Sequence, residues 1–246
     1  MKGWVLVLGG SSAIVRATAA ELAQRGHALY LGGRDQDELA RDASDLAIRY
    51  QIEVAYGRFD ADHMDRFDGF FDEVLRHCGG IEGVVLGYGY LGEQAVAAES
   101  DEETLRIIER NFSSAARVLN RCAAELERQQ HGFIIGIGSV AGDRGRQSNY
   151  TYGAAKGALG LYLEGLRNRL FRSGVKVLTV KPGFVDTAMT FGLPGMFLVA
   201  SPQYVGVRIV RALEKGRHVL YVPWFWRYIM LIIRHIPETI FKRLSL

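Results

Sequence analysis

Three residues in the second half of the chain carry groups suited to proton transfer. Tyr152 and Lys156 are four residues apart in a stretch of helical pattern, so their side chains project from one face of a helix. An unperturbed phenol, with a pKa of about 10, is a poor acid at neutral pH, and a neighbouring ammonium group stabilises the phenolate. Ser139 follows an apolar run and offers a hydroxyl to a substrate oxygen. The pattern predicts general acid/base chemistry at a carbonyl or an alcohol, although an exposed helix pair would show the same spacing.

A glycine-rich turn near the start of the chain carries a second chemical signal. The apolar run Trp4–Leu8 leads directly into this turn, and a helical stretch follows. At such a junction the backbone N–H groups of the helix N-terminus bind the pyrophosphate of a dinucleotide, and glycine permits the tight turn. The residues predicted to contact the pyrophosphate are Gly9, Ser11, Ser12, Ala13 and Ile14.

The end of the second predicted strand indicates which dinucleotide fits. An acidic residue there would bind the ribose 2′-hydroxyl of NAD, but the chain has Gly33 followed by Arg34. A guanidinium group at this place suits a 2′-phosphate, which it binds through paired hydrogen bonds. We therefore expect NADP(H), with NAD(H) as the weaker alternative. The other interpretation is a solvated arginine whose charge Asp35 neutralises.

Short apolar runs alternate with longer helical stretches, which is the pattern of βαβ units. Runs such as Phe133–Ile135 are apolar throughout, as expected of central strands covered on both faces. We predict a single-domain α/β fold, a Rossmann-type doubly wound parallel sheet of about seven strands with short C-terminal helices. The predicted strands are Trp4–Leu8, Ala28–Leu31, Glu53–Gly57, Gly83–Leu86, Phe133–Ile137, Lys176–Val180 and Val219–Val222. The predicted helical stretches include Ala13–Arg25, Asp37–Tyr50, Asp62–Cys78 and one from a capping box at Ser100 toward Gln129.

The composition is that of a globular protein with nearly balanced charges. Of the 246 residues, 48% are hydrophobic and 23% are charged, which excludes disordered, collagen-like and disulfide-scaffold classes. A formal net charge of +3 does not indicate a nucleic-acid partner, for which a clustered basic stripe is typical. Cys78 and Cys122 have no CxxC spacing, and the first apolar run is too short for a signal peptide. We expect a cytoplasmic protein with reduced thiols and no metal site.

The last 23 residues, from Trp224 on, carry the whole formal excess of positive charge. The apolar run that ends at Ile233 is interrupted by Pro223 and a basic residue, which leaves too few residues for a membrane-spanning helix. Aromatic, apolar and basic residues together fit a helix on an anionic membrane surface, at the inner face of a membrane. Helices that cover a substrate cleft or pack on a second subunit fit the same pattern. We therefore divide the chain into a dinucleotide-binding and catalytic domain, 1–222, and a C-terminal helical appendage, 223–246.

Ser139, Tyr152 and Lys156, with Asn111 upstream, resemble the catalytic tetrad of the short-chain dehydrogenases/reductases. The resemblance covers about residues 3–222 and keeps the family's motif order. It implies that Tyr152 transfers the proton and that Ser139 orients the substrate oxygen. It also implies that Lys156 lowers the pKa of the tyrosine and holds the cofactor ribose, while Asn111 holds a relay water. The further cofactor contacts that it implies are Asp60 at the adenine, Ala61, Gly87, Gly89, Tyr152, Lys156, and Pro182, Gly183, Val185 and Thr187 beside the nicotinamide.

The chain departs from the family pattern at two places. Ala13 and Val15 stand where the family has glycine, and Leu86–Gly89 replaces the usual Asn-Asn-Ala-Gly. Val15 is the larger change, because glycine there permits close helix–strand packing, so we expect altered local geometry and cofactor affinity. After the fourth strand only backbone contacts to the cofactor remain. These departures favour one alternative, a non-catalytic dinucleotide-binding scaffold or sensor, and the intact tetrad argues against it.

The segment Tyr88–Glu93 and the C-terminus resemble a smaller branch, similar to decaprenylphosphoryl-2-keto-erythro-pentose reductase, that reduces a keto group on a polyprenyl-phosphate-linked sugar. We therefore expect reduction of a keto group, or oxidation of the alcohol, on a hydrophobic or lipid-linked substrate. Phe184–Ala200 is rich in Met, Phe and Gly and is predicted to be a mobile apolar lid, with a buried helix pair as the alternative. The family resemblance also implies a homodimer or homotetramer.

Overall fold

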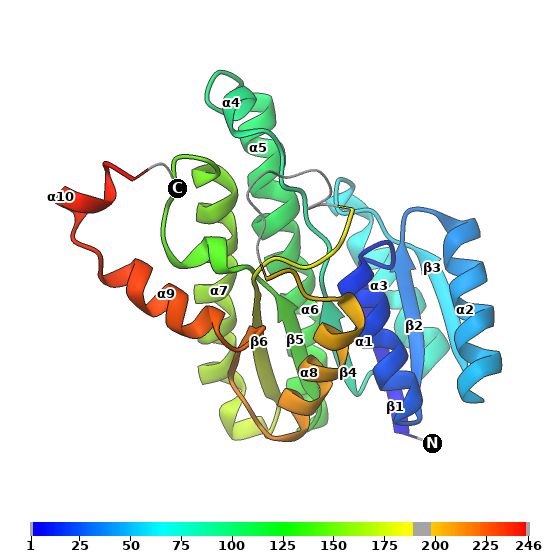
Figure 1. Cartoon of the computed structure of the whole chain (residues 1–246). Helices are drawn as coiled ribbons and strands as arrows, with labels where there is room; N and C mark the ends of the chain where they lie inside the picture. Colours follow the sequence, from blue (N-terminus) through cyan, green and yellow to red (C-terminus); the bar gives the residue numbers. More distant parts are fainter. Residues whose placement is uncertain (1, 189–197, 245–246) are drawn as a thin grey trace.

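Seven parallel strands form one sheet in the order β3-β2-β1-β4-β5-β6-β7 (Figure 1). The computed structural model describes residues 2–188 and 198–244. The strand order reverses between β1 and β4, and doubly wound sheets bind ligands at the carboxyl ends of the strands at this switch point. The strands are β1 (Lys2–Leu8), β2 (His27–Gly33), β3 (Val54–Arg58), β4 (Gly83–Leu86), β5 (Phe133–Ile137), β6 (Lys176–Pro182) and β7 (Val219–Val222).

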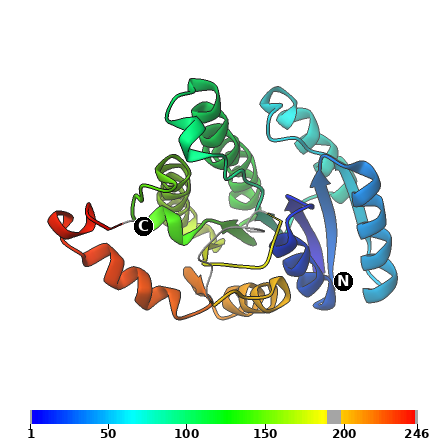
Figure 2. The same cartoon turned by 45° about the horizontal axis from the view of Figure 1, so that its top comes forward.

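Helices cover both faces of this sheet (Figure 2). Apolar side chains of α1, α2 and α8 pack on one face, and those of α3, α6 and α7 pack on the other. The predicted α/β Rossmann-type parallel sheet is therefore confirmed. The helices are α1 (Ala13–Gln24), α2 (Gln36–Tyr50), α3 (Phe67–Cys78), α4 (Gln94–Ala97), α5 (Asp101–Ile108), α6 (Ser114–Gln129), α7 (Tyr150–Leu170), α8 (Pro202–Glu214), α9 (Trp226–His235) and α10 (Glu238–Phe241).

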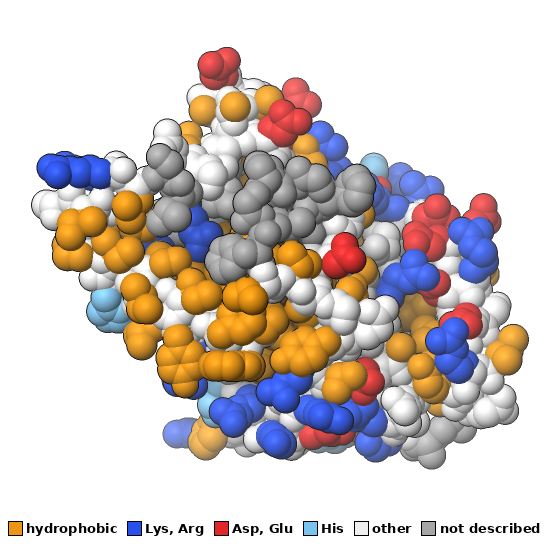
Figure 3. Space-filling view, viewed as in Figure 1, with side chains coloured by type: hydrophobic (Ala, Val, Ile, Leu, Met, Phe, Trp, Pro, Cys, Tyr) orange, Lys and Arg blue, Asp and Glu red, His pale blue; other side chains and the backbone are white. Residues whose placement is uncertain are grey.

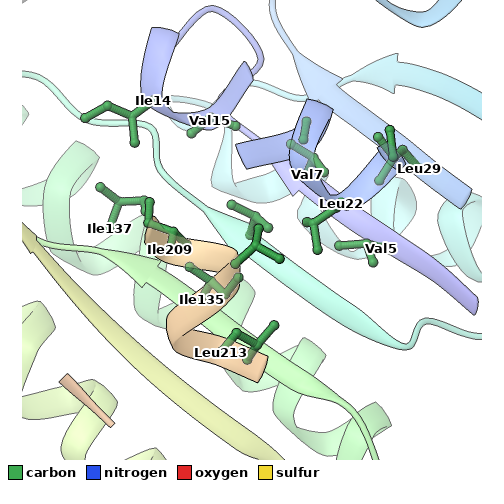
Figure 4. Packing of buried hydrophobic residues seen from close by; sticks show 14 of the residues in the cluster. Val5, Val7, Ile14, Val15, Leu22, Leu29, Ile135, Ile137, Ile209 and Leu213 are labelled. Atoms are coloured by element: carbon green, nitrogen blue, oxygen red, sulfur yellow. The ribbon is translucent and has the colours of Figure 1, made fainter. Parts of the chain in front are cut away.

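The central strands are apolar throughout because each face carries its own core. In β1, Val5 and Val7 belong to the cluster under α1 and α8, whereas Leu6 and Leu8 belong to the cluster under α3 and α6. Figure 4 shows the first cluster, where the α1 side chains lie over the sheet beside Ile209 of α8. Full burial of such a side chain contributes about 1.5–3 kcal/mol, so both faces stabilise the sheet.

The structure moves several predicted boundaries. Three strands are longer than predicted, because pairing continues beyond the apolar run into Lys2, Gly33 and Pro182. The single helix predicted toward Gln129 is instead α5, a π-helical turn over Glu109–Ser113, and α6.

The predicted capping box at Ser100 is half formed. The Ser100 hydroxyl accepts the Glu103 N–H at 3.3 Å and so caps α5. The Glu103 carboxylate accepts the Tyr90 hydroxyl at 2.9 Å, a contact 13 residues away in sequence. The Tyr90 hydroxyl thus takes the place of the Ser100 N–H as the hydrogen-bond donor to Glu103. The spacing of residues within the capping box does not predict this contact.

The C-terminal helices pack on the sheet domain next to the loop after β5. Trp226 and Met230 of α9 are 2% and 0% exposed and form a small core with Val140. The Arg144 guanidinium donates to the carbonyls of Ile233 and Ile236 at 2.8 and 2.7 Å. Residues 2–188 and 198–244 contain no helix that is both long and apolar enough to cross a membrane.

The predicted lid, Phe184–Ala200, lies mostly outside the described residues, which exclude 189–197. Its two ends pair in a parallel bridge between Val185 and Ala200. The Ala200 N–H donates to the Phe184 carbonyl, and the Asp186 N–H donates to the Ala200 carbonyl, both at 3.0 Å. The two described ends of the segment therefore lie side by side.

Candidate active site

A cleft of about 880 Å³ follows the carboxyl ends of the strands, from the turn after β1 to the inner face of α9. It brings together residues that are distant in sequence, as the switch point of a doubly wound sheet predicts. Every predicted site residue except Asn111 lines it. These are Gly9, Ser11, Ser12, Ala13, Ile14, Arg34, Asp60, Ala61, Gly87, Gly89, Ser139, Tyr152, Lys156, Pro182, Gly183, Val185 and Thr187.

Tyr152 and Lys156 lie on the inner side of α7, in the first two turns of that helix. Their side chains are 8% and 5% exposed, which excludes the alternative of an exposed helix pair. The Lys156 ammonium donates to the Ile137 carbonyl at 3.3 Å and lies 5.9 Å from the centre of the Tyr152 ring. Ser139 follows β5, and its hydroxyl accepts the Ala141 N–H at 3.1 Å. The phenol, the ammonium and the hydroxyl therefore meet at one place.

Burial sets the proton affinities of this pair. It raises the pKa of Tyr152 to about 12, in contrast to the lowering by Lys156 that the family resemblance implies, and a hydrogen bond with Ser139 opposes that rise. It lowers the pKa of Lys156 to about 8, because the charged ammonium loses hydration. Tyr152 therefore holds its proton at neutral pH and is available as an acid, and Lys156 changes charge at mildly alkaline pH.

The Lys156 shift predicts a pH dependence for ketone reduction. Lys156 is cationic below its pKa of about 8 and loses the proton as the pH rises through that value. The cation favours loss of the Tyr152 proton, so kcat/KM, which reports the free enzyme, is expected to fall above about pH 8. A pH profile of NADPH oxidation with a model ketone checks this. The Lys156→Arg variant keeps its positive charge, so its kcat/KM should not decrease above about pH 8. A wild-type profile that is flat from about pH 6.5 to 9.5 would contradict this role of Lys156.

Asn111 is placed behind the cleft wall rather than in it. Its side chain is 1% exposed and lies in the π-helical turn between α5 and α6. The amide donates to the carbonyls of Tyr90 at 2.6 Å and Ile107 at 2.8 Å, and its oxygen accepts the Tyr90 N–H at 3.2 Å. A Cβ on Gly89 would stand 2.7 Å from this oxygen and 3.2 Å from the Lys156 ammonium. Asn111 therefore shapes the backbone beside Lys156.

The glycine-rich turn has the geometry that an anion needs. Gly9 has a φ of 103°, and a Cβ there would lie 2.7 Å from the backbone nitrogen of Tyr88, so a side chain is excluded. The first turn of α1 contains no acidic residue, and the Ser12 side chain makes no capping hydrogen bond to α1. The N–H groups and the helix dipole therefore meet no competing carboxylate from this turn.

Val15 and Gly87 depart from the family pattern together. Val15 is fully buried against the sheet, in the same cluster as Ile137 (Figure 4). A Cβ added to Gly87 would clash with the Val15 methyl group and would lie 2.9 Å from Ile137. The larger side chain on α1 therefore fills the space that glycine at the end of β4 leaves open. Val15 is thus accommodated because residue 87 has no side chain, and the expected change in cofactor affinity stays a prediction.

Arg34 stands at the β2 end of the cleft. Asp35, which the sequence offered as a neutralising partner, instead accepts the Glu38 N–H at 2.9 Å and caps α2. Within the described ranges no carboxylate lies within 4.0 Å of Arg34. Asp60 accepts the Asp62 N–H at 3.2 Å, and Asp62 pairs with Arg110. Asp62 also interacts electrostatically with Arg34 but makes no ion pair with it, so the Arg34 guanidinium still has hydrogen-bond donors to offer a ligand.

Several lining residues were missed by the sequence analysis. Arg146 and Asn149 line the cleft just before α7, and Trp226, Ile229 and Ile233 form its wall on α9. The α9 residues recur at helical spacing, and that signal could have identified an inward face. No local signal identified the loop residues. Among the described residues, no three His, Cys, Asp or Glu side chains cluster as a metal site would require.

Comparisons with known proteins place this geometry in a family. The family model described as "short chain dehydrogenase" matches residues 3–194. The chain belongs to the short-chain dehydrogenase family. It is 32% identical over 240 residues to an uncharacterized oxidoreductase of Mycobacterium tuberculosis, covering 98% of this chain and 96% of that relative. An uncharacterized oxidoreductase of Streptomyces coelicolor is also 32% identical, over 243 residues, covering 98% of this chain and 95% of the relative.

Solved short-chain dehydrogenases share the fold. A short-chain dehydrogenase from Sphingobium yanoikuyae in complex with NADPH has a TM-score of 0.83 and 23% identity, covering 96% of this chain and 97% of that chain. An alcohol dehydrogenase from Thermococcus sibiricus complexed with 5-hydroxy-NADP has a TM-score of 0.78 and 25% identity, covering 96% of this chain and 99% of the other. This short-chain dehydrogenase is an oxidoreductase that acts on CH–OH groups with NAD(P).

The described residues fit such a dinucleotide. The turn at Gly9 presents backbone N–H groups without a competing carboxylate in α1, and Gly87 and Gly89 leave room beside the switch point. Lys156 and Tyr152 lie at the same cleft. The residues that would hold the cofactor therefore form a continuous surface.

Proposed function

We propose that the chain is an NADP(H)-dependent reductase of a keto group on a hydrophobic or lipid-linked substrate. One observation carries the proposal. Ser139, Tyr152 and Lys156 meet in the same cleft that begins at the glycine-rich turn and Arg34. Arg34, which forms no ion pair within 4.0 Å with a described carboxylate, supports NADP(H) over NAD(H) because its guanidinium can bind a 2′-phosphate.

NADPH, when bound, supplies the hydride. The residues of this chain provide the proton and the orientation. Tyr152 gives its proton to the carbonyl oxygen, and Ser139 donates a hydrogen bond that orients that oxygen. Charged Lys156 stabilises the phenolate that remains. Asn111 is proposed to hold a relay water at the amide oxygen, which accepts one hydrogen bond, from Tyr90, and keeps a second lone pair.

The wall formed by α9 supports a hydrophobic substrate. Trp226, Ile229 and Ile233 line the cleft, and the Trp226 ring packs edge-on against the Phe184 ring with 5.4 Å between their centres. Each methylene group of a substrate chain buried there would contribute up to about 0.8 kcal/mol to binding. A longer apolar ketone should therefore bind better than a short one.

A pair of ketones tests this substrate class. We expect kcat/KM for NADPH-dependent reduction of 2-decanone to exceed that for 2-butanone by at least about tenfold, because six more methylene groups reach the apolar wall. The Ile229→Ser variant should show a smaller ratio of kcat/KM between 2-decanone and 2-butanone, because the cleft wall loses an apolar side chain. Equal values for the two ketones in the wild-type protein would contradict an apolar substrate.

The outer face of α9 and α10 supports contact with a membrane surface, and with it a lipid-linked substrate. Large apolar side chains are exposed there, and exposed basic residues accompany them (Figure 3). This pattern suits the interface of an anionic bilayer at its inner face. It also supports the branch similar to decaprenylphosphoryl-2-keto-erythro-pentose reductase. The exposed apolar residues are Trp224, Tyr228, Leu231, Ile232, Ile240 and Leu244, and the basic ones are Arg227, Arg234, Lys242 and Arg243.

Vesicle co-sedimentation tests the membrane contact. Removing the whole appendage would also expose the core around Met230, so substitutions on the outer face are cleaner. The double variant Leu231→Glu, Ile232→Glu is expected to lower partition onto anionic vesicles by at least about tenfold, because two apolar side chains lose their burial. Ile48→Glu, on exposed α2, is the matched control. Equal sedimentation of the double variant and the wild type would contradict membrane contact through this face.

We also propose a homodimer or homotetramer in the cytoplasm. The exposed side chains of Leu161 and Phe171, near the middle and at the end of α7, support an interface with a second copy. Sedimentation velocity checks the state, and a monomer at micromolar concentration would contradict it.

A further inference from the structure

Two arginines in the loop before α7 have opposite surroundings. Arg144 is fully engaged with the C-terminal segment: besides its carbonyl contacts, its guanidinium pairs with Glu238 at 2.9 Å and lies 3.8 Å from the centre of the Phe241 ring. It therefore fastens α9 and α10 to the loop. Its role is structural.

Arg146 has no such partner. Its Nε is buried and makes no hydrogen bond to any described residue, and one terminal nitrogen donates only to the Met230 sulfur, at 3.3 Å. In residues 2–188 and 198–244, no carboxylate lies within 4.0 Å of its guanidinium. Thioether sulfur is a weak acceptor, and a desolvated cation without an anion is costly. The nearby acid Asp143 is already engaged by Lys181 at 2.5 Å and by the Tyr221 hydroxyl at 2.7 Å.

Arg146 lines the same cleft as Ser139 and Tyr152, at its α9 end. The glycine-rich turn lies between β1 and α1, on the other side of β4 and β5 from α9 (Figure 1). The free guanidinium is therefore on the substrate side of the tyrosine, beside the apolar wall of α9. Asn149, three residues on, also lines the cleft, and its buried side-chain oxygen lacks a partner among the described residues.

We infer that the substrate carries an oxyanion, a phosphate ester or a carboxylate, which Arg146 binds while the keto group lies at Tyr152. The inference rests on the proposed function and adds a substrate class to it. A planar guanidinium fork matches either oxyanion through two parallel hydrogen bonds. The apolar remainder of the substrate then lies along Trp226, Ile229 and Ile233, and Asn149 offers its amide to a substrate hydroxyl. The cleft is thus built for an amphipathic anion.

Binding of three six-carbon probes to the NADP⁺-saturated protein tests the inference. Calorimetric titration with hexyl phosphate, hexanoate and hexanol compares two oxyanions with a neutral group on the same chain. We expect at least one anionic probe to bind about tenfold or more tightly than hexanol, and Arg146→Met to remove that preference. Phosphate is assigned if hexyl phosphate binds more tightly, and carboxylate if hexanoate does.

The control is Arg208→Met, which removes an exposed cation from α8 and should leave the preference unchanged. The Arg146→Lys variant keeps the positive charge but cannot form the paired hydrogen bonds of a guanidinium group, so it should retain part of the preference for the anionic probes. Retained binding of NADP⁺ shows that each variant is folded, and failure of the wild type to bind NADP⁺ would refute the proposed function instead. Equal binding of hexanol and both anions, or an anion preference that survives in Arg146→Met, would overturn the inference.

Discussion

Replacing Tyr152 with phenylalanine is expected to lower NADPH-dependent ketone reduction by about 10²–10⁴-fold. The substitution removes only the hydroxyl, and the other tyrosine that lines the cleft, Tyr88, has its hydroxyl buried next to Ser114 of α6. Burial holds the proton on Tyr152 at neutral pH, so the wild type carries an acid where the variant has none. Steady-state NADPH oxidation with 2-decanone measures the loss.

The Tyr152→Phe variant should still bind NADPH, because the turn at Gly9 and Arg34 are untouched. A dissociation constant within about twofold of the wild-type value separates loss of the acid from loss of the site. Ser139→Ala serves as a comparison, with a smaller decrease expected because it removes an orienting hydrogen bond. A fully active Tyr152→Phe variant would refute the assignment of this residue as the proton donor.

Replacing Arg34 with alanine is expected to reduce the preference for NADPH over NADH by at least about 30-fold. Charge-assisted hydrogen bonds contribute about 1.5–3 kcal/mol each, and a 2′-phosphate would accept them from a guanidinium that has no carboxylate partner in the described structure. NADH lacks that phosphate, so its use should change little. The ratio of kcat/KM for the two cofactors, at a fixed concentration of 2-decanone, measures the effect.

Arg16→Ala is the matched control for charge alone. Arg16 lies on α1 and pairs with Glu38 at 3.1 Å and Asp42 at 2.6 Å, so its removal should not alter the cofactor ratio. If Arg34→Ala weakened NADPH and NADH equally, the NADP(H) preference would have to be abandoned.

The sequence predicted those parts of the molecule that depend on local spacing. Tyr152 and Lys156 share a helix face because they are four residues apart, and the turn at Gly9 follows directly from a strand and precedes a helix. The strands were recognised as short apolar runs, and several of them, such as β1 and β5, are apolar on both faces. Parallel strands joined by helices leave few topologies, so the doubly wound class of the sheet followed, although its strand order was not predicted.

The parts that escaped prediction depend on contacts between distant segments. The Val15 side chain packs against Gly87, which is 72 residues away in the sequence, so neither residue alone predicts the packing at the turn. Arg146 meets Met230 from a position 84 residues away, which is why the loop was not seen as part of the cleft. The π-helical turn at Asn111 interrupts a pattern that is regular in sequence. Helical period and propensity carry no information on these pairings.

In the C-terminal appendage, the composition of the sequence predicted the character of only one face of α9. Its basic and aromatic composition predicted a helix that lies on a membrane surface, and the exposed side of α9 does carry apolar and basic side chains. The opposite side of the same helix lines the cleft through Ile229 and Ile233. The same helix thus has one face toward the cleft and one exposed face. The sequence alone supports both interpretations, a helix that covers the cleft and a helix on a membrane surface.

The most direct measurement of the central claim is fluorescence titration of the wild-type chain with NADPH and, in parallel, with NADH. It requires no substrate and reports on the turn at Gly9 and on Arg34 together. We predict saturable binding of one NADPH per chain, with a dissociation constant at least about tenfold below that for NADH, because only NADPH brings a 2′-phosphate to Arg34. Absence of binding by either cofactor, or equal binding of both, would contradict the account.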